Sequence, residues 1–535
     1  MKRNRLTQLA LLAMGIAVTS CTDLEVEGSD SIIRQGVGEE FTGVSDPTTA
    51  VEGLFNDMEG FHDDQDNFFA LQEVSTDEQL VPTRGTDWGD NGIWRVLHNH
   101  TWDASHQYLL NTWNNFNQSV FRSSEVIDPR SAASTEQVGQ AQFVRAYSMW
   151  VIMDLFGSVP FRGVDEGPEI NPSVLSRTEA LDFVISDLEA AISALPTVTG
   201  GSGDAHQTAS KATARFLLAR VLLNKHIYNG SGTPDTADMT RVISLVDEIE
   251  ADGFALQAGY FDIFRDSADT ETIWWLETSV GNRIFNGLHY NSTELGGGGW
   301  NGFSTLSEFY DMFEGDANSN RGDIDGSRLD GQEERRGFVP SAGVAFTGAE
   351  GTQDENEDGF EDGSNVGLGF LIGQQFNGNG TEIKDRPGNN LEFTRDFPGL
   401  VGNNERTGIR VQKYAARYGA FNNHQIIFRF ADAHLMRAEA RLRSGGDATA
   451  EINALRTIRS ASPLGAVSEA DILAERGREL YVEFVRRPDM IRFGQYTRDW
   501  EFKDAGSVGD ANKELYPIPA VALLSNPNLQ QNPGY

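Results

Sequence analysis

The chain has 535 residues, 39% of them hydrophobic, and its 79 acidic and 43 basic residues give a formal net charge of −36. A surface this acidic repels nucleic acid and offers no basic face to anionic lipids, which excludes binding of either through charge. The composition favours a neutral or cationic ligand, or an acidic ligand bridged by a metal, although adaptation to a salty habitat would produce the same charge.

The first 20 residues predict a secretory signal peptide. Three basic side chains within MKRNR precede the apolar run LALLAMGIAV, which is too short to span a bilayer as a permanent helix. Small residues then lead to Cys21, the single cysteine of the chain. This arrangement resembles the lipobox of bacterial lipoproteins, in which the signal peptide is cut before the cysteine and its sulfur is acylated, for example with palmitate. Cys21 is therefore predicted to be a lipid anchor; the other interpretation is a small buried side chain.

Residues 21–45 are polar and acidic and are interpreted as a tether between lipid and folded domain. Asp23, Glu25 and Glu27 resemble the export signal of surface-exposed lipoproteins in Bacteroidetes-like bacteria. No later stretch approaches the ~20 apolar residues of a membrane-spanning helix, so the lipid is expected to be the only membrane attachment. We therefore expect an outer-membrane protein that faces the cell exterior and folds without disulfides.

From Asp46 onward, helical periodicity returns in amphipathic segments that end at Gly or Pro. Phe143 and Trp150 fall on one apolar stripe, and Ser176 and Glu179 have the spacing of a capping box. The predicted helical segments are 134–161, 176–196, 208–230, 238–253, 426–446, 448–461 and 468–494. The later segments look like antiparallel helix pairs of the size found in helical-repeat hairpins.

Between these helical parts, residues 278–425 form a segment rich in Gly, Asn and Asp. A loop-rich segment this long within a large domain is usually functional or disordered. Scattered aromatic residues such as Trp300 and Tyr310 argue against plain disorder. The predicted fold class is therefore mainly α with minor β: a helical-hairpin scaffold over 46–277 and 426–535, with a loop-rich insert over 278–425.

Several motifs resemble the SusD/RagB family of outer-membrane nutrient-binding lipoproteins. The closing segment ELYPIPAVALLSNPNLQQNPGY is similar to the end of family members, and ILAERGRELYVEFVRRPDMIRFGQY is similar to the family's preceding helical motif. FVRAYSMWVIMDLFGSVPF resembles an early family helix that ends in Gly-x-Val-Pro. The motifs keep the family's order over nearly the whole chain, while the insert has no motif that aligns with confidence.

The resemblance implies a single domain over 46–535, with tetratricopeptide-like helical hairpins that support a loop-built ligand face. It also implies a non-catalytic lipoprotein that lies as a lid on a TonB-dependent outer-membrane transporter. Members of the family bind oligosaccharides, or peptides in some branches, so both ligand classes stay open, with oligosaccharide as the leading expectation. The competing class is a surface glycoside hydrolase, which would need two carboxylates facing each other across a cleft.

Two stretches combine the flat aromatic and planar polar side chains that a sugar site needs. Ligand binding is expected on loops held by the helices, and family members carry binding residues in corresponding regions. The candidates are Arg84, Asp87, Trp88, Asp90, Asn91 and Trp94 in VPTRGTDWGDNGIW, and Tyr290, Asn291, Trp300 and Asn301 in LHYNSTELGGGGWNGF. The match to the family is one of position, and packing in the core is the alternative role for the tryptophans.

The stretch DENEDGFED resembles a calcium loop. Its oxygen-bearing side chains fall at alternate positions of an EF-hand-type loop, with Gly359 at the turn position; they are Asp354, Asn356, Asp358 and Asp362. Against a calcium site, Asn365 stands where a bidentate Glu is usual, and no flanking helices are evident. A structural Ca²⁺ and a solvated acidic loop both fit, and no other cofactor is expected.

Other charged motifs are interpreted as structural. Glu475, Glu479 and Glu483 recur at helical spacing among arginines, which keeps carboxylates ionised and paired instead of raising one pKa for acid catalysis. Arg429, with Asp432 and Glu439, is expected in a buried polar network between helices. The histidines of HNHTWDASH lack the cysteine or carboxylate partners of a known zinc spacing.

Overall fold

The computed structural model describes residues 40–264, 269–277, 281–292, 298–322, 328–340, 367–377, 380–414 and 424–535. The chain divides into two units, 1–41 and 42–535, and only the last two residues of the first are described. The signal peptide, Cys21, most of the tether and the predicted calcium ligands Asp354, Asn356, Asp358 and Asp362 lie outside the described residues. Within those residues, no helix combines the length and apolar character needed to cross a membrane.

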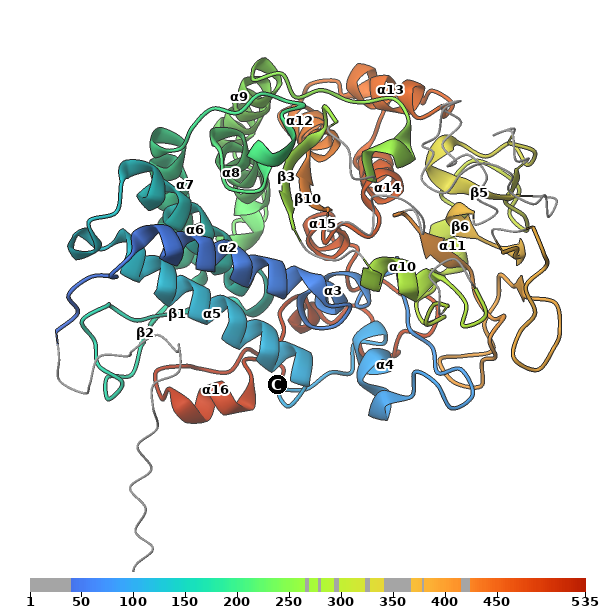
Figure 1. Cartoon of the computed structure of the whole chain (residues 1–535), viewed down its shortest axis with the longest axis horizontal. Helices are drawn as coiled ribbons and strands as arrows, with labels where there is room; N and C mark the ends of the chain where they lie inside the picture. The colour runs from blue at the N-terminus through green and yellow to red at the C-terminus, as the bar shows by residue number, and fades with distance from the viewer. Residues whose placement is uncertain are drawn as a thin grey trace, which may run out of the picture. The chain divides into compact units, whose positions relative to one another are not determined.

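Helices build the scaffold, as Figure 1 shows for the blue-to-green and orange-to-red parts of the chain. The early ones are α2 (Pro47–Asp63), α3 (Asn67–Glu73), α4 (Ile93–His98), α5 (Gln107–Ile127), α6 (Thr135–Phe156), α7 (Arg177–Ala194), α8 (Lys211–Tyr228) and α9 (Thr236–Ala251). The late ones are α12 (Phe430–Arg443), α13 (Thr449–Ile458), α14 (Glu469–Leu480), α15 (Arg486–Arg492) and α16 (Ala520–Ser525). From α5 to α9 each helix packs against the next, and α12 packs against α9. The prediction of a mainly helical, tetratricopeptide-like scaffold is confirmed.

Local sequence signals fix where the central helices begin and end. Ser134 and Ser176 each form a complete capping box, with Gln137 and Glu179 respectively. These boxes satisfy backbone N–H groups that the first turn leaves without helical partners. Gly157 ends α6 in the left-handed conformation, at a φ of 77°.

A short antiparallel strand pair forms the base of the insert. β3 (Thr272–Leu276) precedes the insert, β10 (Gln425–Arg429) follows it, and the two strands pair with each other. The insert's other elements are β4 (Arg321–Gly322), β5 (Gly337–Pro340), β6 (Leu368–Leu371) and β9 (Arg410–Gln412), which form one sheet in that order, the pair β7 (Gly373–Gln374) and β8 (Glu392–Phe393), and the helices α10 (Gly281–Gly287) and α11 (Ser307–Tyr310). The insert therefore leaves and rejoins the scaffold through neighbouring strands.

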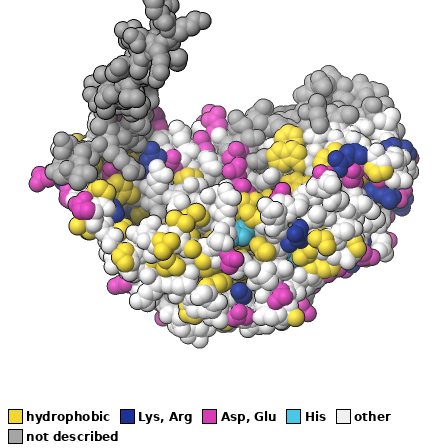
Figure 2. Space-filling model, turned by 90° about the horizontal axis from the view of Figure 1, so that it is seen from below, with side chains coloured by type: hydrophobic (Ala, Val, Ile, Leu, Met, Phe, Trp, Pro, Cys, Tyr) yellow, Lys and Arg dark blue, Asp and Glu magenta, His cyan; other side chains and the backbone are white. Residues whose placement is uncertain are grey.

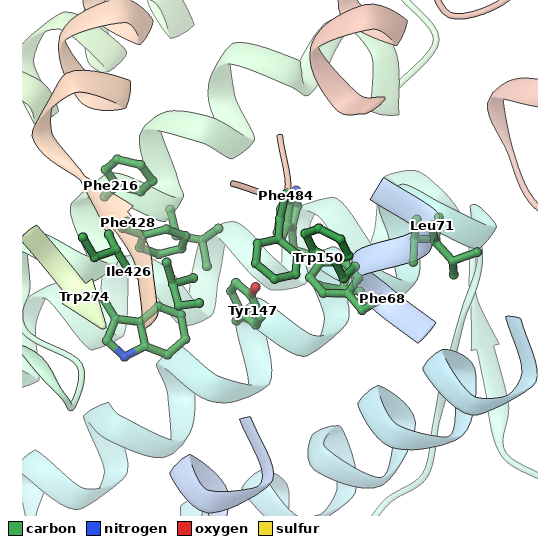
Figure 3. Packing of buried hydrophobic residues seen from close by; sticks show 14 of the residues in the cluster. Phe68, Leu71, Tyr147, Trp150, Phe216, Trp274, Ile426, Phe428 and Phe484 are labelled. Carbon is green, nitrogen blue, oxygen red and sulfur yellow. The ribbon is translucent and has the colours of Figure 1, made fainter. Parts of the chain in front are cut away.

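An aromatic core anchors this strand pair on the helices (Figure 3). The ring of Phe216 in α8 stacks on Phe428 of β10 with 4.3 Å between ring centroids. Trp274 of β3 meets Phe428 at 5.2 Å and Tyr147 of α6 at 5.4 Å, both edge to face. Burying each such side chain contributes roughly 1.5–3 kcal/mol to the free energy of folding. The strands at the base of the insert are therefore held firmly on the scaffold.

The C-terminal tail is fastened to the early part of the domain. The Asn532 side-chain amide donates to the backbone carbonyls of Phe156 (3.0 Å) and Tyr516 (2.6 Å). The Tyr535 hydroxyl accepts from the indole of Trp102 at 2.7 Å. The tail is therefore held on the segments around α5 and α6 without a covalent link.

The predicted continuous helix over 468–494 is wrong. α14 and α15 are separated by a turn in which Val482 and Phe484 take left-handed φ angles of 64° and 63°. Their N–H groups donate to the buried carboxyls of Glu78 (2.6 Å) and Glu73 (2.5 Å), which replace the missing helical partners. The segment 426–446 was likewise predicted as helix throughout, but its first residues, rich in β-branched and aromatic side chains, form β10.

Candidate functional site

The fold brings the two predicted ligand stretches into contact. The indole N–H of Trp88 donates to the carbonyl oxygen of Trp300 at 2.9 Å. Leu80 and Ser304 exchange backbone hydrogen bonds at 2.9 and 3.0 Å, which aligns the two segments antiparallel. Residues more than 200 positions apart in sequence therefore form one loop cluster, which we call the candidate face.

Arg84 is buried under the candidate face, where its hydrogen bonds connect neighbouring loop segments. Its guanidinium donates to the carbonyls of Asn404 (3.0 Å) and Thr407 (2.5 Å) and to the Ser304 hydroxyl (2.7 Å). Only 2% of the residue is exposed, and this burial lowers the pKa of Arg84 to about 9. Arg84 holds the loops in place from below.

Trp88 occupies a constrained position at the rim of the core. It adopts a left-handed φ of 57°, and its ring meets Trp94 at 5.9 Å and Phe303 at 5.8 Å, edge to face. A Cβ at Gly302 would lie 2.3 Å from the Trp88 ring, so glycine is needed for this approach. Trp94 is itself buried and donates to Asp90, whereas Trp88 stays partly exposed.

The second stretch contributes the supporting side chain of Asn301 and the partly exposed rings of Tyr290 and Trp300. Asn301 is fully buried at a φ of 51°; it donates to the carbonyl of Glu405 and accepts from Arg410, both at 2.9 Å. Next to it, the partly exposed ring of Trp300 stacks on Phe285, with 4.9 Å between centroids and 19° between planes. Trp300 therefore has a rigid backing of its own.

A third segment, around Arg386, also forms part of the face, and it was not predicted from the sequence. Arg386 forms ion pairs with both Asp87 and Glu405, and its guanidinium carbon lies 4.1 Å from the centre of the Tyr290 ring. Arg386 and Asp87 are 299 positions apart, so no local spacing could pair them. The only signal in the sequence was the polar stretch KDRPGNN around Arg386, with its Pro-Gly turn.

Two ionisable side chains of the face, Tyr290 and His289, are neutral at pH 7. Burial raises the pKa of Tyr290 to about 12, with a further contribution from the neighbouring Asp87 charge. Burial also lowers the pKa of His289 to about 4. The His289 ring accepts from the Asn291 backbone N–H at 3.0 Å and lies 3.0 Å from Glu405, which places its proton on Nε2.

The face is open, with a small cavity of about 10 Å³ at its edge, enough for one water. The side chains that line it include His289, Ser292, Gln375 and Phe393. The Ser292 hydroxyl is buried there without a hydrogen-bond partner among the described residues.

The remaining predicted polar motifs are structural. Glu475 and Glu479 are buried and paired with arginines, and Glu483, which lies in the turn after α14, pairs with Arg429 and Lys413. Asp432 and Glu439 are also buried and bind arginines of α14 and α15, as predicted: Asp432 pairs with Arg476, and Glu439 with Arg492.

The histidines of HNHTWDASH bind backbone groups. His98 bonds to the carbonyl of Glu501 at 2.9 Å, His100 to that of Ser75 at 2.8 Å and His106 to that of Ile93 at 3.1 Å. In the part of the chain that the structure describes, no group of three or more His, Cys, Asp or Glu side chains is arranged to hold a metal.

Comparison with known proteins agrees over nearly the whole chain. The profile of the SusD family matches residues 270–535, and a profile described as "Starch-binding associating with outer membrane" matches residues 54–223. Starch-binding protein SusD from Bacteroides thetaiotaomicron is 26% identical, with 98% of this chain and 97% of the relative covered.

Solved structures share the fold. A SusD-like protein from Bacteroides fragilis superimposes with a TM-score of 0.66 at 20% identity, covering 92% of this chain and 98% of that one. Surface glycan-binding protein A from B. thetaiotaomicron, solved with laminarihexaose, gives a TM-score of 0.61 at 16% identity, covering 91% and 98% of the two chains.

Proposed function

Since this chain belongs to the SusD/RagB family, we propose that it captures oligosaccharides at the cell surface and delivers them to a TonB-dependent transporter in the outer membrane. The observation that carries the proposal is the candidate face, where partly exposed Trp88, Tyr290 and Trp300 are held by buried polar side chains. Aromatic rings stack on the apolar faces of sugars, while planar polar groups bond their hydroxyls. Relatives described as starch-binding and glycan-binding support the same ligand class.

The face divides the predicted residues into two roles. Asp87, Trp88, Asn91, Tyr290 and Trp300 reach the surface and form the proposed contacts with the glycan. Arg84, Trp94 and Asn301 are buried, and they position the loops that carry those contacts. The open shape of the face suits a chain-like ligand that must also be released for uptake.

The carboxylates of the face favour binding over hydrolysis. Asp87 and Glu405 are the two beside Tyr290, and both are ion-paired to the same guanidinium of Arg386. Burial raises the pKa of Glu405. Hydrogen bonds donated by Arg386 and His289 to the carboxylate outweigh this effect, so the pKa lies below its usual range. A glycosidase needs a general acid with a raised pKa, so we propose that the protein is not an enzyme.

The location belongs to the same proposal. The signal peptide over 1–20, acylation of Cys21 and the acidic tether would anchor the domain to the outer membrane, facing the exterior. The description of the matching profile as associating with the outer membrane supports this placement. Labelling with a palmitate analogue, in wild type and in Cys21→Ala, tests the anchor: label that persists in the variant would contradict it.

A structural Ca²⁺ at Asp354, Asn356, Asp358 and Asp362 remains part of the proposal. Alternating oxygen donors around a glycine turn are the chemistry that calcium prefers. Calorimetric titration with Ca²⁺ before and after Asp354→Asn tests it, and equal heats in the two proteins would mean that the loop is only solvated.

Binding itself is tested with Trp88→Ala. A glycan screen followed by calorimetry should find an oligosaccharide whose affinity falls about 2- to 13-fold in the variant, the equivalent of losing one aromatic stacking contact of about 0.5–1.5 kcal/mol. Trp275→Ala is the matched control, because Trp275 lies on β3 and bonds to Gly203 instead of the candidate face. Binding of peptides but no glycan would favour the peptide-binding alternative, and sugar release by the purified protein would show a hydrolase.

A further inference from the structure

Three guanidinium groups act on Tyr290 through their charge. Arg386 lies over the ring, while Arg84 and Arg410 lie below the face, close enough to each other to share acceptors. Both donate to the Ser304 hydroxyl, at 2.7 Å and 2.9 Å, and to the Thr407 carbonyl, at 2.5 Å and 2.7 Å.

The two buried arginines lack carboxylate partners among the described residues. Arg410 is fully buried, and its other acceptors are the Asn301 side chain and the carbonyls of Gly408 and Glu405. Carbonyl and hydroxyl oxygens carry only partial negative charges, so they solvate these cations without neutralising them. Burial lowers the pKa of Arg410 well below its usual range, and the charge of Arg84 lowers it further.

Other buried arginines fall into two groups. Arg335, Arg429 and Arg459 are equally buried, and each is bound to two or more carboxylates. Arg283 and Arg336 instead bind carbonyl and hydroxyl oxygens, as Arg84 and Arg410 do. The candidate face differs in holding two such arginines that share their acceptors.

The charged groups linked by these contacts leave one positive charge in excess, and Asp90, whose carboxylate accepts from Trp94, is not ion-paired with any of them. Arg84, Arg386 and Arg410 contribute three positive charges, and Asp87 and Glu405 contribute two negative ones. His289 is neutral at pH 7 because burial lowers its pKa to about 4. One additional negative charge would balance the described groups.

Figure 2 shows the domain from below. At the right-hand edge, the side of the insert in Figure 1, Lys and Arg side chains lie beside acidic ones. Basic side chains of the insert are ion-paired, for example Arg395 with Asp311 and Lys384 with Glu382.

We propose that the glycan bound at this face is anionic, and that its carboxylate, as in a uronic acid residue, pairs with Arg386 in place of Asp87. This proposal rests on the proposed function. A ligand can reach Arg386, because 48% of its side chain is exposed. The side chain of Asp87 is 30% exposed and belongs to the same loop as Gly85. A guanidinium binds a carboxylate in a planar, bidentate geometry, so the exchange keeps Arg386 paired while the ligand brings the missing charge.

The ligand class is tested with pairs of oligosaccharides that differ only in charge. Uronate-bearing oligosaccharides of several backbones are compared by calorimetry with their carboxyl-reduced counterparts, alongside neutral starch and laminarin oligosaccharides. We expect the tightest ligand to lose at least about tenfold in affinity on carboxyl reduction, the equivalent of one charged hydrogen bond of about 1.5 kcal/mol. Its binding should also weaken between 50 and 500 mM salt, because salt screens exposed charges.

Variants separate a ligand contact from a structural role. Arg386→Gln should lower the affinity for the uronate ligand about tenfold, and Asp87→Asn, which removes the competing charge but keeps hydrogen bonding, should raise it. Opposite effects of the two variants on the uronate ligand identify a charge contact, because loss of a merely structural role would lower the affinity in both variants. Arg395→Gln is the control, because Arg395 also lies in the insert but pairs with Asp311.

The outcomes distinguish the two proposals. If a neutral oligosaccharide binds best, with no salt dependence and no gain in Asp87→Asn, the anionic ligand class is overturned while glycan binding stands. If no glycan of either kind binds, the proposed function fails, and the ligand class fails with it.

Discussion

At the residue scale, Glu73 and Glu78 form a buried carboxyl pair that holds the turn between α14 and α15. Each accepts a backbone N–H from that turn, and both are fully buried against it. Burial raises the pKa of Glu73 to about 7 and raises that of Glu78 as well, with the charge of Glu73 adding to the second shift. At neutral pH the pair therefore retains a proton that the unfolded chain would release.

This pair predicts an unusual pH dependence of stability. Because the folded protein binds the proton more tightly than the unfolded chain, the pair's stabilisation is complete below pH ~4.5 and is lost as the pH rises through about 7. We expect the free energy of unfolding of the wild type, relative to that of Glu78→Gln, to fall between pH 5 and 8. The comparison cancels the buried histidines such as His62, whose lowered pKa acts in the opposite direction in both proteins. Parallel curves for the two proteins over this range would show that the pair does not share a proton.

The residue scale also shows which residues of the candidate face could be predicted from the sequence. Trp88, Tyr290 and Trp300 were predicted because aromatic, polar and Gly residues alternate locally around them. Arg386 was not, because its partners Asp87 and Glu405 come from other segments and only the fold brings them together. Spacing alone also could not tell that Arg84 is buried, since nothing local to it distinguishes a supporting arginine from a ligand contact.

At the element scale, one side chain of α14 joins the scaffold to the insert. The Glu479 carboxylate accepts from Arg429 of β10 at 2.8 Å and from Arg459 at 3.0 Å. It also accepts from Arg335, in the insert, at 3.2 Å. All four side chains are fully buried, so the network ties the elements on both sides of the insert's base to the same helix.

Glu479→Gln should therefore destabilise the protein strongly. Removing one charge leaves three buried guanidinium groups short of a partner, at a cost of about 3–5 kcal/mol in the free energy of unfolding. Glu469→Gln, at the exposed start of the same helix, should leave the denaturation midpoint almost unchanged. Equal midpoints for wild type and Glu479→Gln would mean that the network adds nothing to stability.

The elements themselves were predictable where their signals are local. Capping boxes at Ser134 and Ser176 marked helix starts from a few neighbouring residues. The turn at Val482 and Phe484 was missed because the groups that stabilise it, Glu73 and Glu78, lie about 400 positions away in sequence. Contacts of that range override local helical periodicity, and no spacing reveals them.

At the scale of the whole molecule, the helices support the candidate face, which is formed by the insert together with the loop around Trp88. The described domain carries no disulfide, so apolar packing, buried ion pairs and the C-terminal clamp hold it together. The aromatic core of Figure 3 supports β3 and β10, from which the insert departs. In the sequence, the motifs of the closing segment and of the helices indicate the family, whereas these long-range contacts leave no local signal.

The central claim is that the candidate face binds an oligosaccharide. The most direct measurement is a crystal structure of the protein with the oligosaccharide that binds most tightly in the screen. We predict sugar rings stacked on Trp88 and Trp300, with an anionic group beside Arg386. A glycan bound elsewhere on the domain, with the rings of Trp88 and Trp300 still facing solvent, would contradict the account.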